Sequence, residues 1–302
     1  MKVRDELILL YGIFMVTSSS FIVLDATDNG IPINRVLLAF SRVLFTGSIS
    51  LLFLSKQTRK HSVEENQVNF FTKHPTISIC LAGVSLAAHF AWFFLSLDFL
   101  PVGISLSLTN TAPLWMLMLS IIMFKEHPRF IDWIAILSAI VGIGILGSKN
   151  LNLNGSWSDY TIGVFYSLAS GFVLAIYLIL ARHGVRKMGL WRYFGLVNIS
   201  SAGSLLLYIV ITDTFVQISL ATLWYGLLLA IFPGLMGHAA FQYSMSKLPT
   251  PLVGAATIGE PVLGTILAFI FLGQYLVFSD VLGIVITLFA LSIVAYTNQQ
   301  KN

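Results

Sequence analysis

The stretch from Leu248 to Leu272 combines two features that seldom occur together: it is apolar enough to cross a lipid bilayer, and it carries an acid and a proline near its middle. A helix needs about 20 apolar residues to span the hydrocarbon core. Glu260 would be costly at that depth unless it faces protein or a water-filled cavity. Pro261 lacks an N–H, so the carbonyl of Thr257 loses its helical partner. The pattern predicts an interrupted membrane helix whose broken part lines a cavity or a close helix contact.

A second stretch of the chain repeats this organisation. The sequence from Leu100 to Trp115 aligns with the first without gaps at a constant offset of 148 residues, which is the separation of Pro113 and Pro261. Thr109 therefore precedes its proline by four residues, as Thr257 does. Interrupted helices at corresponding positions of two halves are a sequence pattern typical of transporter binding sites.

The composition indicates a membrane protein. Of the 302 residues, 57% are hydrophobic and 10% are charged, whereas soluble domains carry about 25% charged residues. We therefore predict an all-α integral membrane protein with ten transmembrane helices and no soluble domain. The predicted helices cover residues 6–24, 32–54, 75–97, 101–123, 130–148, 158–181, 191–212, 220–245, 249–272 and 278–297.

The basic residues orient the predicted helices. With the N-terminus in the cytoplasm, fourteen Lys and Arg residues fall on the cytoplasmic side and only Lys149 falls on the other. This bias follows the positive-inside rule and predicts that both termini are cytoplasmic. It also accounts for the net charge of +4 without a nucleic-acid partner. Because each half has five helices, an odd number, residues 1–149 and 150–302 would form two inverted five-helix repeats.

Three segments of the chain resemble a known family. They are residues 32–52, 113–126 and 260–273, and their order along the chain is the specific part. The sequence resembles the EamA family of the drug/metabolite transporter superfamily over nearly its whole length. Gln274 departs from the family pattern, which usually has Glu there, as at Glu126. The resemblance implies transport of amino acids or other metabolites, often export, with helices 1–4 and 6–9 around a central cavity and helices 5 and 10 at the periphery.

Arg42 is the base that we place near the middle of the membrane. Counted from Pro32, it lies about 15 Å deep at 1.5 Å per helical residue, whereas Arg35 is shallow enough for its side chain to reach the surface. A guanidinium at that depth suits a clamp for a carboxylate or another anion. It would also suit a structural partner of Glu260 or of the carbonyls at a helix break. Both alternatives stay open.

Glu260 is the acid that we place inside the membrane core. It would bind a substrate ammonium, carry a coupling proton, or neutralise Arg42, and the sequence does not choose among these roles. Trp92, Asn110 and Thr111 also fall near mid-membrane, on helices that the resemblance places around the centre. We therefore predict that these three residues bind substrate and share one cavity with Arg42 and Glu260.

His89 and His238 are candidates for a proton relay, because histidine titrates near neutrality. The alternative is that each is a hydrogen-bonded residue of the helix core. The single cysteine, Cys80, excludes an intrachain disulfide and a cysteine-based metal centre. We expect no metal and no cofactor.

The predicted function is that of a secondary transporter, an exporter of amino acids or similar small metabolites that works by alternating access around a midplane cavity between the repeats. Import of a similar solute is the alternative. A membrane sensor explains the paired interruptions less well. An intramembrane enzyme is not indicated, because the chain has no H-E-x-x-H pair and no nucleophile elbow, so we assign no catalytic residue. We expect a monomer or weak homodimer in the plasma membrane, the inner membrane of a bacterium, acting on a small solute; proton coupling is left open.

Overall fold

The computed structural model describes residues 2–28, 34–53, 74–96, 98–100, 102–125, 127–148, 157–212, 219–272 and 277–299. These residues are helical and joined by short turns, and no strand occurs among them. Each of the ten predicted apolar runs coincides with one helix or with consecutive helical segments. The all-helical class is therefore confirmed. The polar connection between residues 54 and 73, Pro32, Glu126 and Gln274 lie outside the described residues.

The chain divides into two compact units that do not follow the sequence halves. Unit 1 consists of Met1–Ala91 and Ile176–Lys247, and unit 2 of Trp92–Ala175 and Leu248–Asn302. Each unit thus combines helices from both halves. The predicted boundary near residue 149 concerns the sequence repeats and stays a prediction.

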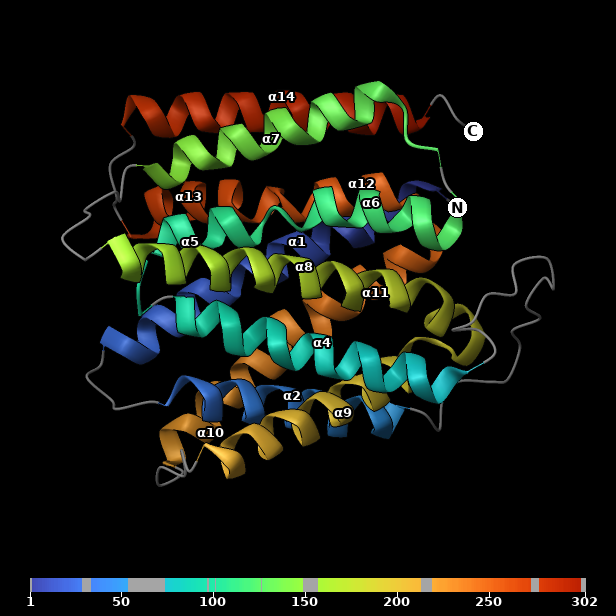
Figure 1. Ribbon diagram of the computed structural model, residues 1–302, viewed down its shortest axis with the longest axis vertical. Helices are drawn as coiled ribbons and strands as arrows, with labels where there is room; N and C mark the ends of the chain where they lie inside the picture. Colours follow the sequence, from blue (N-terminus) through green and yellow to red (C-terminus); the bar gives the residue numbers. More distant parts are fainter. Residues whose placement is uncertain are drawn as a thin grey trace. The chain divides into compact units, whose positions relative to one another are not determined.

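Unit 1 contains the helices of the chain's beginning and of its third quarter. The α2 helix packs against α9 and α10, while α1 packs against η2 and α11 (Figure 1). The helices are α1 (Lys2–Asp28), α2 (Arg35–Leu52), most of α4 (Pro75–Ser96), the second part of α8 (Trp157–Met188), α9 (Leu190–Ile211), α10 (Leu220–Leu229), the π-helix η2 (Ala230–His238) and α11 (Ala239–Lys247).

Unit 2 contains the two interrupted helices. The α6 helix packs against α12, and α7 packs along α14 (Figure 1). The helices are α5 (Val102–Thr109), α6 (Ala112–Phe124), α7 (Phe130–Ser148), α12 (Thr250–Thr257), α13 (Gly259–Leu272) and α14 (Phe278–Gln299), with the first part of α8.

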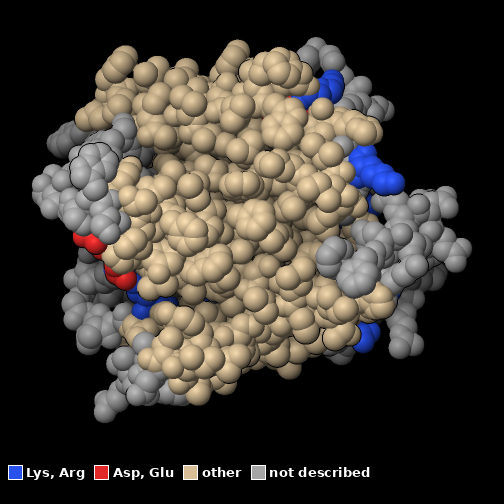
Figure 2. Space-filling view, viewed as in Figure 1, with Lys and Arg blue, Asp and Glu red and all other residues tan. Residues whose placement is uncertain are grey.

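Six helical stretches of the described residues are long and apolar enough to cross a membrane, and three shorter apolar helices accompany them. Large apolar side chains such as Leu220 and Phe278 are exposed on helix surfaces. Most of the face shown in Figure 2 is formed by residues other than Lys, Arg, Asp and Glu. These features suit a protein surrounded by lipid. The number of ten membrane crossings stays a prediction.

The helix pair α7 and α14 is held by close backbone contact. A Cβ added to Gly142 would clash with Thr287 Oγ1 and lie 3.0 Å from the carbonyl oxygen of Gly283. Small residues let membrane helices approach closely and gain van der Waals contact. Ala139 and Ala290 are fully buried in the same contact.

Identical caps occur at the starts of α7 and α14, at the offset of 148 residues. Asp132 accepts a hydrogen bond from the backbone N–H of Arg129 through Oδ2 at 2.9 Å. Asp280 accepts one from the N–H of Val277 through Oδ2, also at 2.9 Å. Both carboxylates are buried and satisfy an N–H that the helix start leaves without an intrahelical partner. The repeat alignment read from the sequence therefore extends to a shared hydrogen bond.

We expect Gly142→Ala to lower the free energy of unfolding by about 1–3 kcal/mol, because the added methyl group must push α7 away from α14. Gly144→Ala is the matched control, since a Cβ there meets nothing within 4 Å. Thermal unfolding of both variants in detergent measures the difference. Equal midpoints for the two variants would show that the contact at Gly142 does not hold the pair together.

Candidate functional site

Arg42 lies in the interior of unit 1 with its guanidinium over an aromatic ring. It is on α2 and is only 5% exposed. Its Cζ atom lies 4.2 Å from the ring centroid of Phe90 on α4. A cation over a ring face is attracted by the ring quadrupole, and the attraction strengthens when water is excluded. This contact holds the charged end of Arg42 at the Phe90 ring.

Three further side chains with rings form a series of contacts that begins at Phe90. The His89 ring lies 5.0 Å from it and the His238 ring 6.0 Å, between centroids. Tyr177 on α8 lies 6.0 Å from His238. His238 and Tyr177 both interact electrostatically with Arg42. Together with Gln242 on α11, these residues form what we call the Arg42 cluster: Arg42, His89, Phe90, Tyr177, His238 and Gln242.

A π-helix brings His238 into the cluster. The segment Phe232-Pro233-Gly234 lies inside the run predicted as one continuous helix over residues 220–245, and Pro233 cannot donate a backbone hydrogen bond. The chain forms the π-helix η2 there and returns to α-helix at Ala239. Gly234 permits the close approach of η2 to α2, because a Cβ on it would lie 2.7 Å from Thr46 Oγ1. Single π-helical segments inside α-helices occur frequently at functional sites.

Four buried polar atoms of the Arg42 cluster have no hydrogen-bond partner among the described residues: Tyr177 Oη, His238 Nδ1, and Gln242 Oε1 and Nε2. Tyr177 and Gln242 are fully buried. The Tyr177 hydroxyl and the Gln242 amide are close enough to interact. Their geometry does not meet the distance and angle criteria of a hydrogen bond. Buried polar atoms are nearly always satisfied, and each exception costs about 1–3 kcal/mol. The cluster is therefore incomplete by itself and suited to a polar ligand or to water.

The interruption between α5 and α6 in unit 2 is repaired by its own side chains. Asn110 Nδ2 donates to the carbonyl of Leu106 at 3.0 Å, and Thr111 Oγ1 donates to the carbonyl of Leu108 at 2.7 Å. Both side chains are buried. Their donor groups thus serve the helix end, which is a structural role that the sequence does not reveal.

Pro113 and the interruption between α12 and α13 lie close together. A Cβ on Gly254 would lie 3.5 Å from Pro113 Cα, so α12 contacts the start of α6 directly. Thr257 Oγ1 donates to the carbonyl of Gly254 at 2.8 Å, and α12 ends at Thr257. The two matched breaks are therefore neighbours in unit 2.

Glu260 is half-buried in the first turn of α13, and Pro261 follows it in the same turn. A carboxylate is favoured there by the partial positive charge of a helix start. Trp92 is half-buried in the part of α4 that belongs to unit 2. Arg42, in unit 1, and Glu260, in unit 2, belong to different units, so their shared cavity and their pairing stay predictions.

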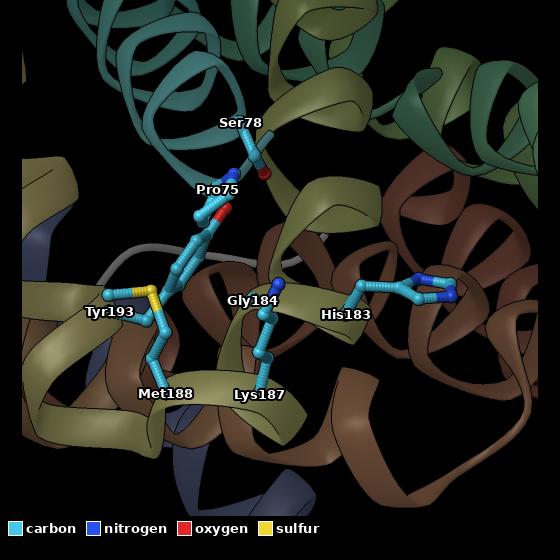
Figure 3. A pocket seen from close by; sticks show the side chains of 7 residues that line it. All are labelled: Pro75, Ser78, His183, Gly184, Lys187, Met188 and Tyr193. Atoms are coloured by element: carbon cyan, nitrogen blue, oxygen red, sulfur yellow. The ribbon is translucent and has the colours of Figure 1, made fainter. Parts of the chain in front are cut away.

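A small pocket of unit 1 lies at the ends of α4, α8 and α9, and no residue of the Arg42 cluster lines it (Figure 3). It has room for about one water molecule. The Tyr193 ring is pressed against Gly184, where a Cβ would clash with it. The pocket is lined by Pro75, Ser78, His183, Gly184, Lys187, Met188 and Tyr193. It is too small for a metabolite and belongs to the packing of these helix ends.

Comparison with known families identifies the chain. The sequence profile of the EamA-like transporter family matches residues 6–148 and 161–296. The chain belongs to the EamA-like transporter family. The resemblance read from the sequence is thereby confirmed, and this EamA-like chain is a multi-pass membrane protein that acts on small solutes. Members of the family are transporters and not enzymes.

Curated relatives of this EamA-like chain include exporters. It is 24% identical to the threonine/homoserine exporter RhtA of Salmonella typhimurium over 220 residues, which cover 71% of this chain and 69% of that protein. It is 26% identical to RhtA of Escherichia coli K12 over 217 residues, 68% of this chain and 66% of that protein. A crystal structure with 14% sequence identity matches it with a TM-score of 0.79 over 99% of both chains, which shows the fold.

Arg42, His89 and His238 are candidates from the sequence, and the structure brings them together in unit 1. Phe90, Gln242 and the π-helix were not predicted. The local signal for the π-helix is Pro233 in the middle of an apolar run, ahead of His238. No sequence signal distinguishes Gln242, because its importance comes from burial without a partner.

We expect Gln242→Leu to leave the thermal midpoint of the solute-free protein unchanged or higher. Leucine has a similar volume and removes two buried polar atoms that lack partners. Asn110→Leu is the control, since its amide is bonded to Leu106 and its loss should lower the midpoint. Unfolding in detergent, followed by tryptophan fluorescence, compares them. A clear fall for Gln242→Leu would mean that Gln242 is a structural residue.

Proposed function

We propose that this EamA-like chain is a secondary transporter that exports amino acids or similar small metabolites across the inner membrane of a bacterium. The observation that carries the proposal is the incomplete Arg42 cluster in a family of transporters, with exporters of amino acids among the relatives. Buried polar atoms without hydrogen-bond partners, as in Tyr177, His238 and Gln242, are costly in an apolar protein. A solute that forms hydrogen bonds with these atoms would remove this cost.

Alternating access between two inverted five-helix repeats is the proposed mechanism. It is supported by the packing of α2 against its counterpart α9 and of α7 against its counterpart α14, and by the contact between the two interrupted helices, where α6 packs against α12. The shared caps at Asp132 and Asp280 support the same repeat. Repeats related in this way generate two conformations by exchanging the environments of equivalent helices. Both termini are proposed to be cytoplasmic, and the protein to be a monomer or a weak homodimer.

The experiment that tests export uses proteoliposomes and inside-out vesicles. We expect vesicles containing the protein to take up L-threonine or a related amino acid through the face that is cytoplasmic in the cell, with faster exchange when unlabelled solute is inside. Uptake only through the opposite face would favour the alternative, an importer of a similar solute. No flux for any amino acid or small metabolite would contradict the proposal.

Glu260 is proposed to couple transport to a second partner, either a substrate ammonium or a proton. It stands half-buried beside the break at Pro261, where an ionisable side chain is costly and commonly functional. A ligand shifts a conformational equilibrium only if its affinity differs between the two conformations. If Glu260 binds a substrate ammonium in one conformation and a proton in the other, each partner favours one conformation.

We expect Glu260→Gln to insert and fold normally and to lose at least tenfold in transport rate, or to lose its response to a pH gradient. Glutamine keeps the shape and hydrogen-bonding capacity but removes the charge. Initial rates in proteoliposomes with and without a pH gradient measure this, and Glu260→Asp is the control that keeps the charge. A variant with the wild-type rate and pH response would show that Glu260 is a structural counter-ion.

A further inference from the structure

A group of basic side chains lies at one end of unit 1, where α8 ends and α9 begins. The sequence has no acidic residue between Asp159 and Asp213. Within this interval Arg186, Lys187 and Arg192 are exposed. The neighbouring part of the chain therefore carries no carboxylate that would balance the charge of these three side chains.

A hydrogen bond brings a fourth exposed cation to the same place. Arg186 Nε donates to the backbone carbonyl of Ser246 at 2.7 Å, so the end of α11 lies beside the end of α8. The next residue, Lys247, is the last of α11 and is exposed. We call the four exposed cations the basic patch: Arg186, Lys187, Arg192 and Lys247.

Asp5 of α1 also approaches this end of the unit, but it is paired locally. It accepts a hydrogen bond from Tyr243 Oη at 3.0 Å, one turn of α11 before Lys247. Arg4 Nη2 lies 3.6 Å from the same carboxylate oxygen. The basic patch therefore keeps its net positive charge, and an anionic partner complements it.

The basic patch lies where helices reach the edge of the membrane. Stretches long and apolar enough to cross a bilayer end at Met188 and at Lys247, and another begins at Leu190. The rings of Phe53, at the end of α2, and Trp191 are in contact here, with centroids 5.2 Å apart. Tryptophan is enriched at the level of the lipid headgroups. The charged groups that surround the patch in a cell therefore include those of the lipids.

The small pocket beside Lys187 adds a buried hydrogen-bonding group to this surface. Lys187 lines it together with Ser78 and Tyr193 (Figure 3). Tyr193 is fully buried, and its hydroxyl has no hydrogen-bond partner among the described residues. Ser78 is near enough to interact with this hydroxyl, but their geometry is not that of a hydrogen bond. The pocket has room for one headgroup oxygen or one water molecule.

An apolar surface begins at the same pocket. Pro75, the first residue of α4, lines the pocket, and Ile77 and Leu81 in the following turns are exposed. These two residues are four apart and share one face of the helix. A phospholipid combines a negative headgroup with an apolar chain, whereas a soluble anion would leave this face uncovered.

We propose that the basic patch and the small pocket bind the headgroup of an anionic phospholipid, whose acyl chain lies along Ile77 and Leu81 of α4. Lys187 and Arg192 bind the phosphate, and Arg186 holds the end of α8 to α11. Basic pockets between membrane helices on the cytoplasmic side bind phosphate-bearing headgroups in this way. The inference concerns a lipid partner and does not depend on which solute the protein transports.

The test measures lipid binding to the purified full-length protein in detergent, by native mass spectrometry and by the lipid-induced rise of the thermal midpoint. The probes are phosphatidylglycerol, phosphatidylcholine with the same chains but no net charge, and glycerol 3-phosphate, which has no acyl chain. We expect phosphatidylglycerol to bind at least tenfold more tightly than the other two. Equal binding of phosphatidylcholine would overturn the proposal. Equal binding of glycerol 3-phosphate would show a site for soluble phosphates and would overturn it as well.

Two variants and one matched control assign the binding to the basic patch. We expect Lys187→Gln and Arg192→Gln each to raise the dissociation constant of phosphatidylglycerol about fivefold, which is the contribution of one basic residue near an anionic membrane surface. Lys125→Gln is the control, since it removes an exposed cation of unit 2, outside the patch, and should bind as the wild type does. Wild-type affinity in both patch variants would overturn the assignment, as would an equal loss in the control.

Tyr193→Phe tests the part of the site inside the pocket. We expect it to raise the dissociation constant of phosphatidylglycerol at least threefold, because the headgroup or its bound water loses a hydrogen bond. The variant keeps the ring that packs against Gly184, and its thermal midpoint without lipid checks that it folds. Wild-type affinity would show that the pocket is not part of the lipid site.

Discussion

The structure depends on one constraint: a polar group inside a membrane protein must find its partner within the protein, within a bound ligand or in enclosed water. The helix breaks of unit 2 meet this constraint internally. The interrupted helices are repaired by Asn110, Thr111 and Thr257, whose side chains donate to carbonyls at the same helix ends. Ser107 likewise donates to the carbonyl of Ile143 on α7. Unit 1 meets it incompletely, because Tyr177, His238 and Gln242 keep buried polar atoms without partners. The Arg42 cluster is therefore a better candidate for recognition than the helix breaks.

The features that could be predicted from the sequence are the local ones. Helix positions follow from apolar runs, and interruptions follow from the missing N–H of Pro113 and Pro261, which is a property of the residue itself. The capping carboxylates Asp132 and Asp280 are visible through the repeat offset. The close contact of Gly142 with α14 is expected from the small residues of its helix.

The features that could not be predicted depend on contacts between distant segments. Pro233 signals a defect in its helix, but the π-helix and the close approach of Gly234 to Thr46 on α2 are visible only in the structure. Gln242 is an ordinary amide in the sequence, and its isolation appears only once α11 is placed. The division into units was likewise not visible, since the repeat pattern suggests halves and the packing combines helices from both.

The position of the Arg42 cluster along α4 and α8 suggests how binding would act on the rest of the molecule. The division between the units falls within these two helices, between Ala91 and Trp92 and between Ala175 and Ile176. Phe90 and Tyr177 therefore stand next to the residues where each helix passes from one unit to the other. A solute bound at the cluster would contact the two helices, α4 and α8, that contribute residues to both units. Such a solute would change the balance between conformations if one of them holds the cluster in a better binding geometry. Recognition and conformational change would then depend on the same few side chains, which is the coupling that a transporter needs.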